Sequence, residues 1–155
     1  MPNVLSIRFN NIDIYAEEKN GEIIKIGFKK RKNRNVSFIL SLFKKQVKEY
    51  MKGERKRFEI PFKIEAREFD KKVYQVLLSV PYGATITYKE LAEKVGNKKA
   101  ARAVGQALSR NPLPLIIPCH RVIKSNGEIG GFTAGEKIKA KLLEIEGVKF
   151  NKNCF

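Results

Sequence analysis

The sequence is poor in the residues from which disulfide frameworks and metal centres are built. It contains two cysteines, Cys119 and Cys154, one histidine, His120, and no tryptophan. Two cysteines far apart in the chain do not form a disulfide framework, and with a single histidine they do not complete a zinc site. We therefore expect reduced, intracellular thiols and no bound metal.

The features of secreted and membrane proteins are also missing. The N-terminus has no basic-then-apolar leader, and no apolar run approaches the length that spans a bilayer. The chain has no internal repeat and no low-complexity segment. We therefore expect a soluble, cytoplasmic protein that does not associate with membranes.

Acidic residues are scarce relative to basic ones. The 155 residues include 32 Lys+Arg and 16 Asp+Glu, a formal net charge of +16. A charge of this sign predicts a polyanionic partner, with nucleic acid ahead of a membrane surface. The charge-rich surfaces of thermophilic proteins gain Lys and Glu together, so they do not explain a two-to-one excess of basic residues.

The first part of the chain predicts a three-stranded antiparallel meander. Apolar residues alternate over residues 4–9, 12–16 and 23–28, and the turn signals Asn10-Asn11 and Asn20-Gly21 separate these runs. The chain is long enough to bury a core, in one domain or in two small ones that share an interface.

A helix should follow the meander, with Ser37 as its cap and Gly53 as its end. The next alternating run, residues 58–64, contains Pro61, which restricts it to an edge strand or an extended linker. We place the domain boundary there. Residues 1–65 are then an N-terminal scaffold domain without chemistry of its own, and residues 66–155 form the second domain.

The second domain is predicted to be mostly helical and winged-helix-like. An apolar stripe marks a helix over residues 69–80, and Thr87 caps a short helix that Gly96 ends. A further helix from about Lys98 to Leu108 completes a helix-turn-helix. The remaining expected elements are a strand at 122–123 that returns over 129–132, and a last helix over 135–146. The fold class is therefore α/β, of the α+β kind.

The segment Ile117-Pro118-Cys119-His120-Arg121 brings together the groups of thiol chemistry. A thiolate is the reactive form of cysteine, and a neighbouring base or positive charge lowers the pKa of the thiol. His120 and Arg121 are such groups, and they suggest that the sulfur is kept ionised. Neighbours on an extended strand point to opposite faces, so Pro118 must start a turn for Cys119 and His120 to converge.

The helix ending at Leu108 is rich in small residues, among them Ala100, Ala101 and Gly105. Small side chains allow another helix or a nucleic acid to approach the backbone closely. Tight helix packing would account for the glycine and for part of the alanines, but it does not account for Arg102 within the run.

Residues 80–147 resemble the O6-alkylguanine-DNA alkyltransferases, single-use repair proteins that take an alkyl group from damaged guanine onto their own cysteine. The matching pieces occur in the order and at the spacing of that family: Tyr82-Gly83, Thr87-Tyr88, 99–105, Arg110-Asn111-Pro112, 117–122, Gly127 and Glu146-Gly147. The resemblance covers nearly half of the chain, and the N-terminal half matches in architecture more than in sequence.

The resemblance implies how DNA would be bound. Arg102 matches the finger residue that enters the base stack where the flipped nucleotide had been, from a helix in the minor groove, where Ala100 and Ala101 suit a narrow space. Thr87 and Tyr88 belong to the DNA-binding set, and Tyr88 crowds the phosphate. Asn111 matches the hinge between the recognition helix and the active-site segment. The resemblance implies that the partner is double-stranded DNA containing O6-alkylguanine, and we expect the protein to act as a monomer.

The catalytic set implied by the resemblance centres on Cys119. His120 acts as its base, through water, and Glu146 orients the imidazole. Tyr88 offers a hydroxyl to the guanine edge, and Lys139 helps to protonate the leaving guanine. Transfer of the alkyl group to sulfur needs no cofactor. Activity on O4-alkylthymine stays open at this point.

The base pocket implied by the resemblance has side-chain and backbone walls. Its expected lining is Leu108, Pro114, Val122, Phe132 and Thr133, and Arg121 is expected to be structural. Phe132 stands where the family often has tyrosine, which removes a possible hydroxyl donor. Ala134 stands where glycine is common, and its methyl group is expected to disfavour bulky groups such as benzyl.

Two other functions remain open from the sequence. A cysteine hydrolase would also use a thiolate and a histidine, and Cys119, His120 and Glu146 superficially qualify. Such an enzyme would not need a helix-turn-helix, Arg102 or so basic a surface. A non-catalytic protein that binds alkylguanine in DNA is the second alternative, but such proteins lack the reactive cysteine. No function is predicted for Cys154.

Overall fold

A computed structural model describes residues 1–97 and 99–151 of the chain. Cys154, and Lys98 at the expected start of a helix, lie outside the described residues. The chain forms two compact units, Met1–Glu65 and Ala66–Phe155, and each is described by itself. No helix in the described part of the chain has the length and apolar character needed to cross a membrane.

Unit 1 contains the predicted antiparallel meander, with the strand order β1-β2-β3. The strands are β1 (Asn3–Phe9), β2 (Ile12–Lys19) and β3 (Glu22–Gly27). The tight turns between them need left-handed backbone, which asparagine and glycine tolerate best. Asn20 (φ 54°) and Gly21 (φ 81°) supply it between β2 and β3.

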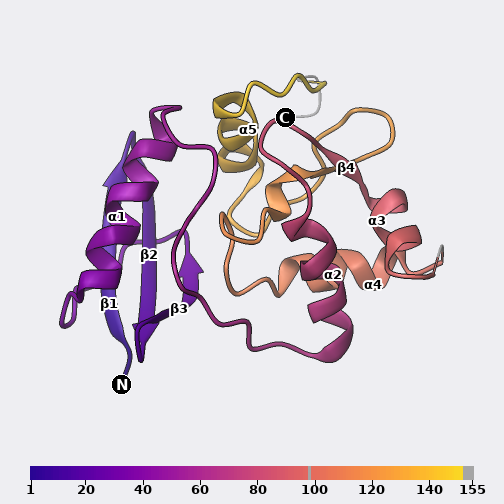
Figure 1. The fold of residues 1–155 in the computed structure, drawn as a ribbon. Coiled ribbons are helices and arrows are strands. Elements are labelled where there is room, and N and C mark those ends of the chain that lie inside the picture. The colour runs from indigo at the N-terminus through magenta and orange to yellow at the C-terminus, as the bar shows by residue number, and fades with distance from the viewer. Residues whose placement is uncertain (98, 152–155) are drawn as a thin grey trace. The chain divides into compact units, whose positions relative to one another are not determined.

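Helix α1 (Phe38–Met51) packs on this sheet (Figure 1). It begins where the sequence predicts, because the Ser37 hydroxyl accepts a hydrogen bond of 3.2 Å from the backbone N–H of Leu40. It ends at the left-handed Gly53 (φ 75°). The apolar residues at helical spacing are buried: Leu40, Phe43, Val47, Tyr50 and Met51.

The segment after α1 runs beside β3 as an edge contact. Ile23 donates to the carbonyl of Pro61 at 2.9 Å and accepts from the N–H of Lys63 at 3.0 Å, so Phe62 forms a parallel bridge with Ile23. Pro61 has no N–H to donate, so the pairing cannot extend through it toward α1.

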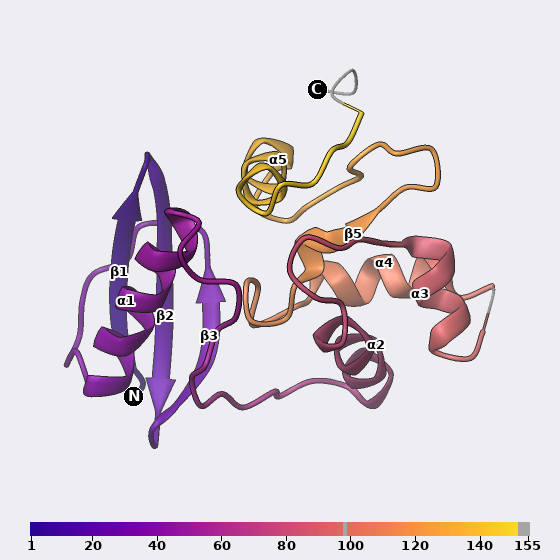
Figure 2. The same ribbon diagram turned by 45° about the horizontal axis from the view of Figure 1, so that its top comes forward.

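Unit 2 is mostly helical. Its elements are α2 (Glu68–Leu78), β4 (Ile86–Thr87), α3 (Tyr88–Lys94), α4 (Ala101–Ser109), the 3₁₀ helix η1 (Cys119–Arg121), β5 (Val122–Ile123) and α5 (Glu136–Ile145). Helices α2, α3 and α4 pack on one another, and α3 with α4 forms the helix-turn-helix (Figure 2). The capping box between Thr87 and Glu90 starts α3.

Two details of unit 2 differ from the sequence prediction. Helix α4 begins at Ala101, later than expected, because the Asn97 side chain accepts from the N–H of Lys99 and holds a turn there. Residues 129–132 do not form a return strand: β5 pairs in parallel with β4 instead. The positive φ of Gly130 (74°) turns the backbone out of a strand conformation at that point.

Candidate active site

A tight turn presents Cys119. Pro118 has φ −78° and ψ 66°, and the N–H of Cys119 donates to the carbonyl of Ile117 at 2.7 Å, which is the geometry of an inverse γ-turn. The 3₁₀ helix η1 follows at once and contains Cys119, His120 and Arg121. The turn at Pro118 that the sequence required is therefore present, and all three side chains are buried.

Asn111 ties the end of the recognition helix to this turn. Its amide nitrogen donates to the carbonyl of Ile117 at 3.0 Å, and its amide oxygen accepts from the N–H of Leu113 at 2.9 Å. Between these two contacts Leu115 has φ 78°, a strained conformation for a residue with a side chain. At the hinge position implied for Asn111, the two hydrogen bonds of its side chain therefore hold the loop between α4 and Cys119 in place.

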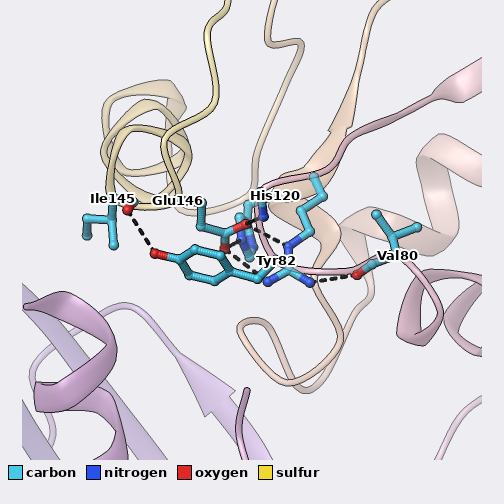
Figure 3. A network of polar contacts seen from close by, with 7 residues as sticks. Val80, Tyr82, His120, Ile145 and Glu146 are labelled. Carbon is cyan, nitrogen blue, oxygen red and sulfur yellow. Dashed lines mark hydrogen bonds and ion pairs between the residues drawn. The ribbon is translucent and has the colours of Figure 1, made fainter. Parts of the chain in front are cut away.

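The buried carboxylate of Glu146 is the centre of a network of polar contacts that includes His120 (Figure 3). The Nε2 atom of His120 lies 2.6 Å from Oε2 of Glu146. Arg121 donates to both oxygens of the same carboxylate, at 2.8 and 3.1 Å, and a third donor of its guanidinium reaches the carbonyl of Val80 at 2.7 Å. A charge buried this deeply is tolerated only with such partners.

The position of Glu146 is fixed by the loop before β4. The N–H of Gly83 donates to Oε1 of Glu146 at 3.2 Å, and the hydroxyl of Tyr82 donates to the carbonyl of Ile145 at 2.9 Å (Figure 3). Glu146 directly follows α5, where the helix dipole disfavours a negative charge. The N–H of Gly83 and the guanidinium of Arg121 donate to the carboxylate and compensate for that position.

Burial acts against the charged forms of two adjacent titratable groups, Cys119 and His120. Burial raises the pKa of the Cys119 thiol to about 11, although a hydrogen bond from Asn111 and the charge of Lys139 act in the opposite direction. Burial also lowers the pKa of His120, and Glu146 offsets this only in part. The expectation that His120 and Arg121 keep the sulfur ionised is not met in the free protein, because desolvation outweighs the hydrogen bond from Asn111 and the charge of Lys139.

Lys139 is buried beside the same centre. Its ammonium group donates to the carbonyls of Val122 at 2.6 Å and Gly131 at 3.1 Å, and it lies 5.8 Å from the centre of the Tyr88 ring. Burial lowers its pKa to about 8, and the nearby sulfur of Cys119 acts against this shift. A lysine with such a pKa can give up a proton near neutral pH.

A cavity of about 420 Å³ opens at the sulfur of Cys119. Its lining consists of Tyr88, Gly105, Leu108, Ser109, Cys119, Gly131, Phe132 and Thr133. Of the residues expected at the base pocket, Leu108, Phe132 and Thr133 are in this wall. Pro114 and Val122 are not in it, because both are buried in the core beside it.

Sequence reasoning missed part of the wall. Gly105, Ser109 and Gly131 were not assigned to the pocket. The adjacent glycines Gly130 and Gly131 are the sequence signal that could have indicated part of this wall, since glycine allows two parts of a chain to approach closely. That approach is between Gly130 and Tyr88: a Cβ atom at Gly130 would lie 2.7 Å from the Tyr88 hydroxyl. At Gly105 and Gly131 a Cβ would meet no atom within 4 Å, so these two glycines widen the cavity.

The residues expected to contact DNA lie on α3 and α4. Thr87 caps α3, Ala100 is buried just before α4, and Ala101 and Arg102 are exposed in the first turn of α4. Leu108 near the other end of α4 is in the cavity wall. One helix therefore joins an exposed arginine to the pocket of the cysteine.

No group of three potential metal ligands is present among residues 1–97 and 99–151. The reactive groups at the site are the thiol of Cys119, the imidazole of His120 and the carboxylate of Glu146.

The sequence profile described as "6-O-methylguanine DNA methyltransferase, DNA binding domain" matches residues 68–148. The chain belongs to this family. A methylated-DNA–protein-cysteine methyltransferase of Methanosarcina acetivorans is 48% identical over 103 residues, which are 66% of each chain. The constitutive enzyme of that name from Bacillus subtilis is 47% identical over 111 residues, 70% of this chain and 67% of that protein. The matches thus span about two thirds of these relatives.

Solved structures of the family extend the similarity over both units. The O6-methylguanine methyltransferase of Mycobacterium tuberculosis has a TM-score of 0.84 at 28% identity, covering 94% of this chain and 93% of that one. The OGT protein of Mycobacterium tuberculosis in complex with DNA also gives 0.84 at 28% identity, with coverage of 93% and 92%. An O6-methylguanine DNA methyltransferase from Methanococcus jannaschii gives 0.70 at 32% identity, with coverage of 97% and 99%. The α/β fold is therefore that of the family.

Proposed function

We propose that this protein repairs DNA by moving the alkyl group of O6-alkylguanine onto the sulfur of Cys119, once per molecule and without a cofactor. The observation that carries the proposal is the position of Cys119 in the wall of a cavity of about 420 Å³, beside Tyr88. The names of the relatives support the same reaction, since they are methylated-DNA–protein-cysteine methyltransferases.

The reaction begins with an internal proton transfer. Nε2 of His120 is engaged by Glu146, so Nδ1 is the nitrogen that takes the thiol proton, directly or through a water molecule. The ionised Glu146, held by Arg121, stabilises the imidazolium that forms. The thiolate appears only as the proton moves, which suits a cysteine whose pKa is about 11 in the free protein.

The thiolate then attacks the alkyl carbon in line with the bond to O6 of guanine. A carbon–sulfur bond forms, the carbon–oxygen bond breaks, and its electron pair stays on guanine, which takes up a proton. We assign this proton to Tyr88, which lines the cavity, and to Lys139, whose ammonium lies 5.8 Å from the Tyr88 ring centre. Overall, the thiol proton is exchanged for the alkyl group.

The product is permanent because a thioether has no acyl centre for water to attack. The protein therefore acts once, as a reagent rather than as a turning-over catalyst. This distinguishes it from a cysteine hydrolase built on Cys119, His120 and Glu146, which would release its product and repeat the cycle.

Access to the sulfur requires the damaged nucleotide to leave the duplex. We propose that Arg102, which is exposed at the first turn of α4, fills the gap that the flipped nucleotide leaves in the base stack. Ala100 and Ala101 would then lie close to the minor groove. Leu108 lies six residues after Arg102 along the same helix, about 9 Å by helical rise, and lines the cavity. The protein acts in this way on double-stranded DNA as a monomer.

Mass spectrometry after mixing with a duplex that contains O6-methylguanine tests the proposal. We expect the mass of one methyl group to be added at Cys119, in a one-to-one ratio and without turnover. Cys119→Ser should gain nothing. Repeated release of product from each protein molecule, or methylation at another residue, would overturn the assignment.

A further inference from the structure

Unit 1 has no part in the chemistry, yet it carries half of the net positive charge. Residues 1–65 contain sixteen basic and eight acidic residues, a net charge of +8, which is the same as for residues 66–155. The excess is concentrated: residues 23–48 include nine basic residues and no acidic residue. A scaffold with only a solvated surface does not need such a block.

The densest part of this block is an ordered stretch of chain, not a loose tail. It comprises Lys29, Lys30, Arg31, Lys32 and Arg34 between β3 and α1, and we call it the cationic edge. In Figure 2 the connection from β3 to α1 passes outside β1.

Backbone contacts hold the cationic edge along β1. Val4 and Arg34 exchange two backbone hydrogen bonds, of 2.8 and 2.9 Å. The N–H of Arg31 donates to the Ser6 hydroxyl at 3.1 Å, and the N–H of Ser6 donates to the Asn33 side chain at 2.8 Å. Long blocks of like charge are usually disordered because they repel one another. Here the chain is held in place despite that repulsion.

The side chains divide into anchored and outward-facing ones. Arg31 lies 4.7 Å from the centre of the Tyr15 ring and 3.6 Å from a carboxylate oxygen of Glu17, so it is partly neutralised. Lys30, Lys32 and Arg34 are exposed and form no ion pair with any residue in the described part of the chain. Nη1 of Arg34 donates to the sulfur of Met1 at 3.6 Å, which leaves its charge unpaired, so all three cations can meet an anionic ligand.

We propose that the cationic edge is a second binding surface for the phosphate backbone of DNA, separate from helix α4. The proposal rests on the proposed function, which makes duplex DNA the polyanion that this protein meets. Duplex DNA carries one negative charge per about 1.7 Å of axis, and each cation that meets a phosphate releases a counterion. The surface therefore raises general affinity for DNA without reading its sequence.

The test compares two triple variants that remove the same charge. The edge variant is Lys30→Ala, Lys32→Ala and Arg34→Ala. The control variant is Lys52→Ala, Arg57→Ala and Lys63→Ala, which removes two lysines and one arginine from the exposed segment after α1. Affinity for an undamaged duplex of about 30 base pairs is measured across a range of salt concentrations for both variants and for the unchanged protein.

For the edge variant we expect binding at least about tenfold weaker at low salt, and a slope of log K against log salt that is smaller by up to ~2.7, at ~0.9 per lost phosphate contact. The control variant should lose clearly less in both quantities. Equal affinities and equal slopes for the two triple variants would overturn the proposal.

Two further measurements separate the possible explanations. Vesicles containing anionic phospholipid are tested with the same variants, since the exposed Val36 and Phe38 next to the edge would also suit a membrane surface. Loss of vesicle binding by the edge variant, with DNA binding unchanged, would overturn the assignment to DNA. Methyl transfer to Cys119 should persist in both variants. If the unchanged protein transfers no methyl group, the proposed function fails, whatever the salt slopes are.

Discussion

The carboxylate of Asp70 on α2 receives two hydrogen bonds from the guanidinium of Arg110, at 2.9 and 3.0 Å. Arg110 directly follows α4 and precedes Asn111, so the pair holds the end of the recognition helix where the chain turns toward Cys119. On the neighbouring turn of α2, the Tyr74 hydroxyl donates to the carbonyl of Ala107 at 2.7 Å. These bonds fix α4 on α2.

Replacing Asp70 by asparagine should destabilise the protein in a pH-dependent way. The carboxylate is buried and accepts charge-assisted bonds, so the loss in free energy of unfolding should be about 1.5–3 kcal/mol at pH 7. Arg110 holds the pKa of Asp70 below its ordinary value of 3.8. A group with a lowered folded pKa contributes stability above its unfolded pKa and loses that contribution as the pH falls.

Urea unfolding at pH 7 and at about pH 3 checks this prediction. The difference between the Asp70→Asn variant and the unchanged protein should shrink at the lower pH. Glu93→Gln, an exposed carboxylate on α3, is the matched control and should change stability by less than about 0.5 kcal/mol at either pH. A difference that stays constant with pH would argue against the ion pair as its cause.

Cys119 should react slowly with a small alkylating reagent such as iodoacetamide at neutral pH. Burial raises its pKa to about 11, so the thiolate fraction is very small at pH 7 and increases toward pH 11. The rate of modification at Cys119, followed by mass spectrometry, should rise with pH and approach half of its maximum near the folded pKa.

The unfolded protein in denaturant is the reference for this measurement, and its half-maximum should lie near the ordinary pKa of about 8.5. If the rate of modification at Cys119 reached half of its maximum at a lower pH in the folded protein than in the unfolded protein, burial would not be raising the pKa of the thiol.

Gly130→Ala should slow alkyl transfer by moving Tyr88. The new Cβ would lie 2.7 Å from the Tyr88 hydroxyl, and Tyr88 is in the cavity wall. The variant also places a side chain at φ 74°, which costs about 1–3 kcal/mol of stability. The measurement is the rate of methyl transfer from the damaged duplex, at a temperature where the variant is folded.

Gly127→Ala separates the two effects, because Gly127 also has a positive φ (86°) but no atom lies within 4 Å of its Cβ position. It should lose stability by a similar amount and keep its rate of transfer. Equal slowing of both variants would mean that backbone strain, rather than contact with Tyr88, controls the rate.

Arg102→Ala should impair repair of duplex DNA more than reaction with free O6-alkylguanine base. The side chain is exposed on the first turn of α4 and does not line the cavity, so a free base does not need it. Single-turnover rates with the two substrates give the comparison, and Gln106→Ala, also exposed on α4, is the control. Equal losses on both substrates would remove Arg102 from the role of finger residue.

Much of the fold was predictable because its signals are local. The hydroxyls of Ser37 and Thr87 cap the helices that follow them, and the Asn20-Gly21 turn needs only the left-handed backbone of two residues. The prediction of a return strand at 129–132 was wrong because β5 pairs with β4 instead. In this pairing Val122 lies opposite Ile86, which is 36 residues earlier in the chain. Pairing of distant segments leaves no local signal.

The sequence by itself determined that a cysteine, an imidazole and a carboxylate belong to one site, since their motif and spacing resemble those of a known family. Only the tertiary structure decided the direction in which the pKa values of Cys119 and His120 move, because burial among residues distant in sequence is the largest influence on both. The tertiary structure also brings Arg121 to Glu146, where it donates two hydrogen bonds to the carboxylate. It places Gly105 and Gly131 where the lack of a side chain leaves room in the cavity. Desolvation and open space depend on how separate segments pack, and no short stretch of sequence contains that information.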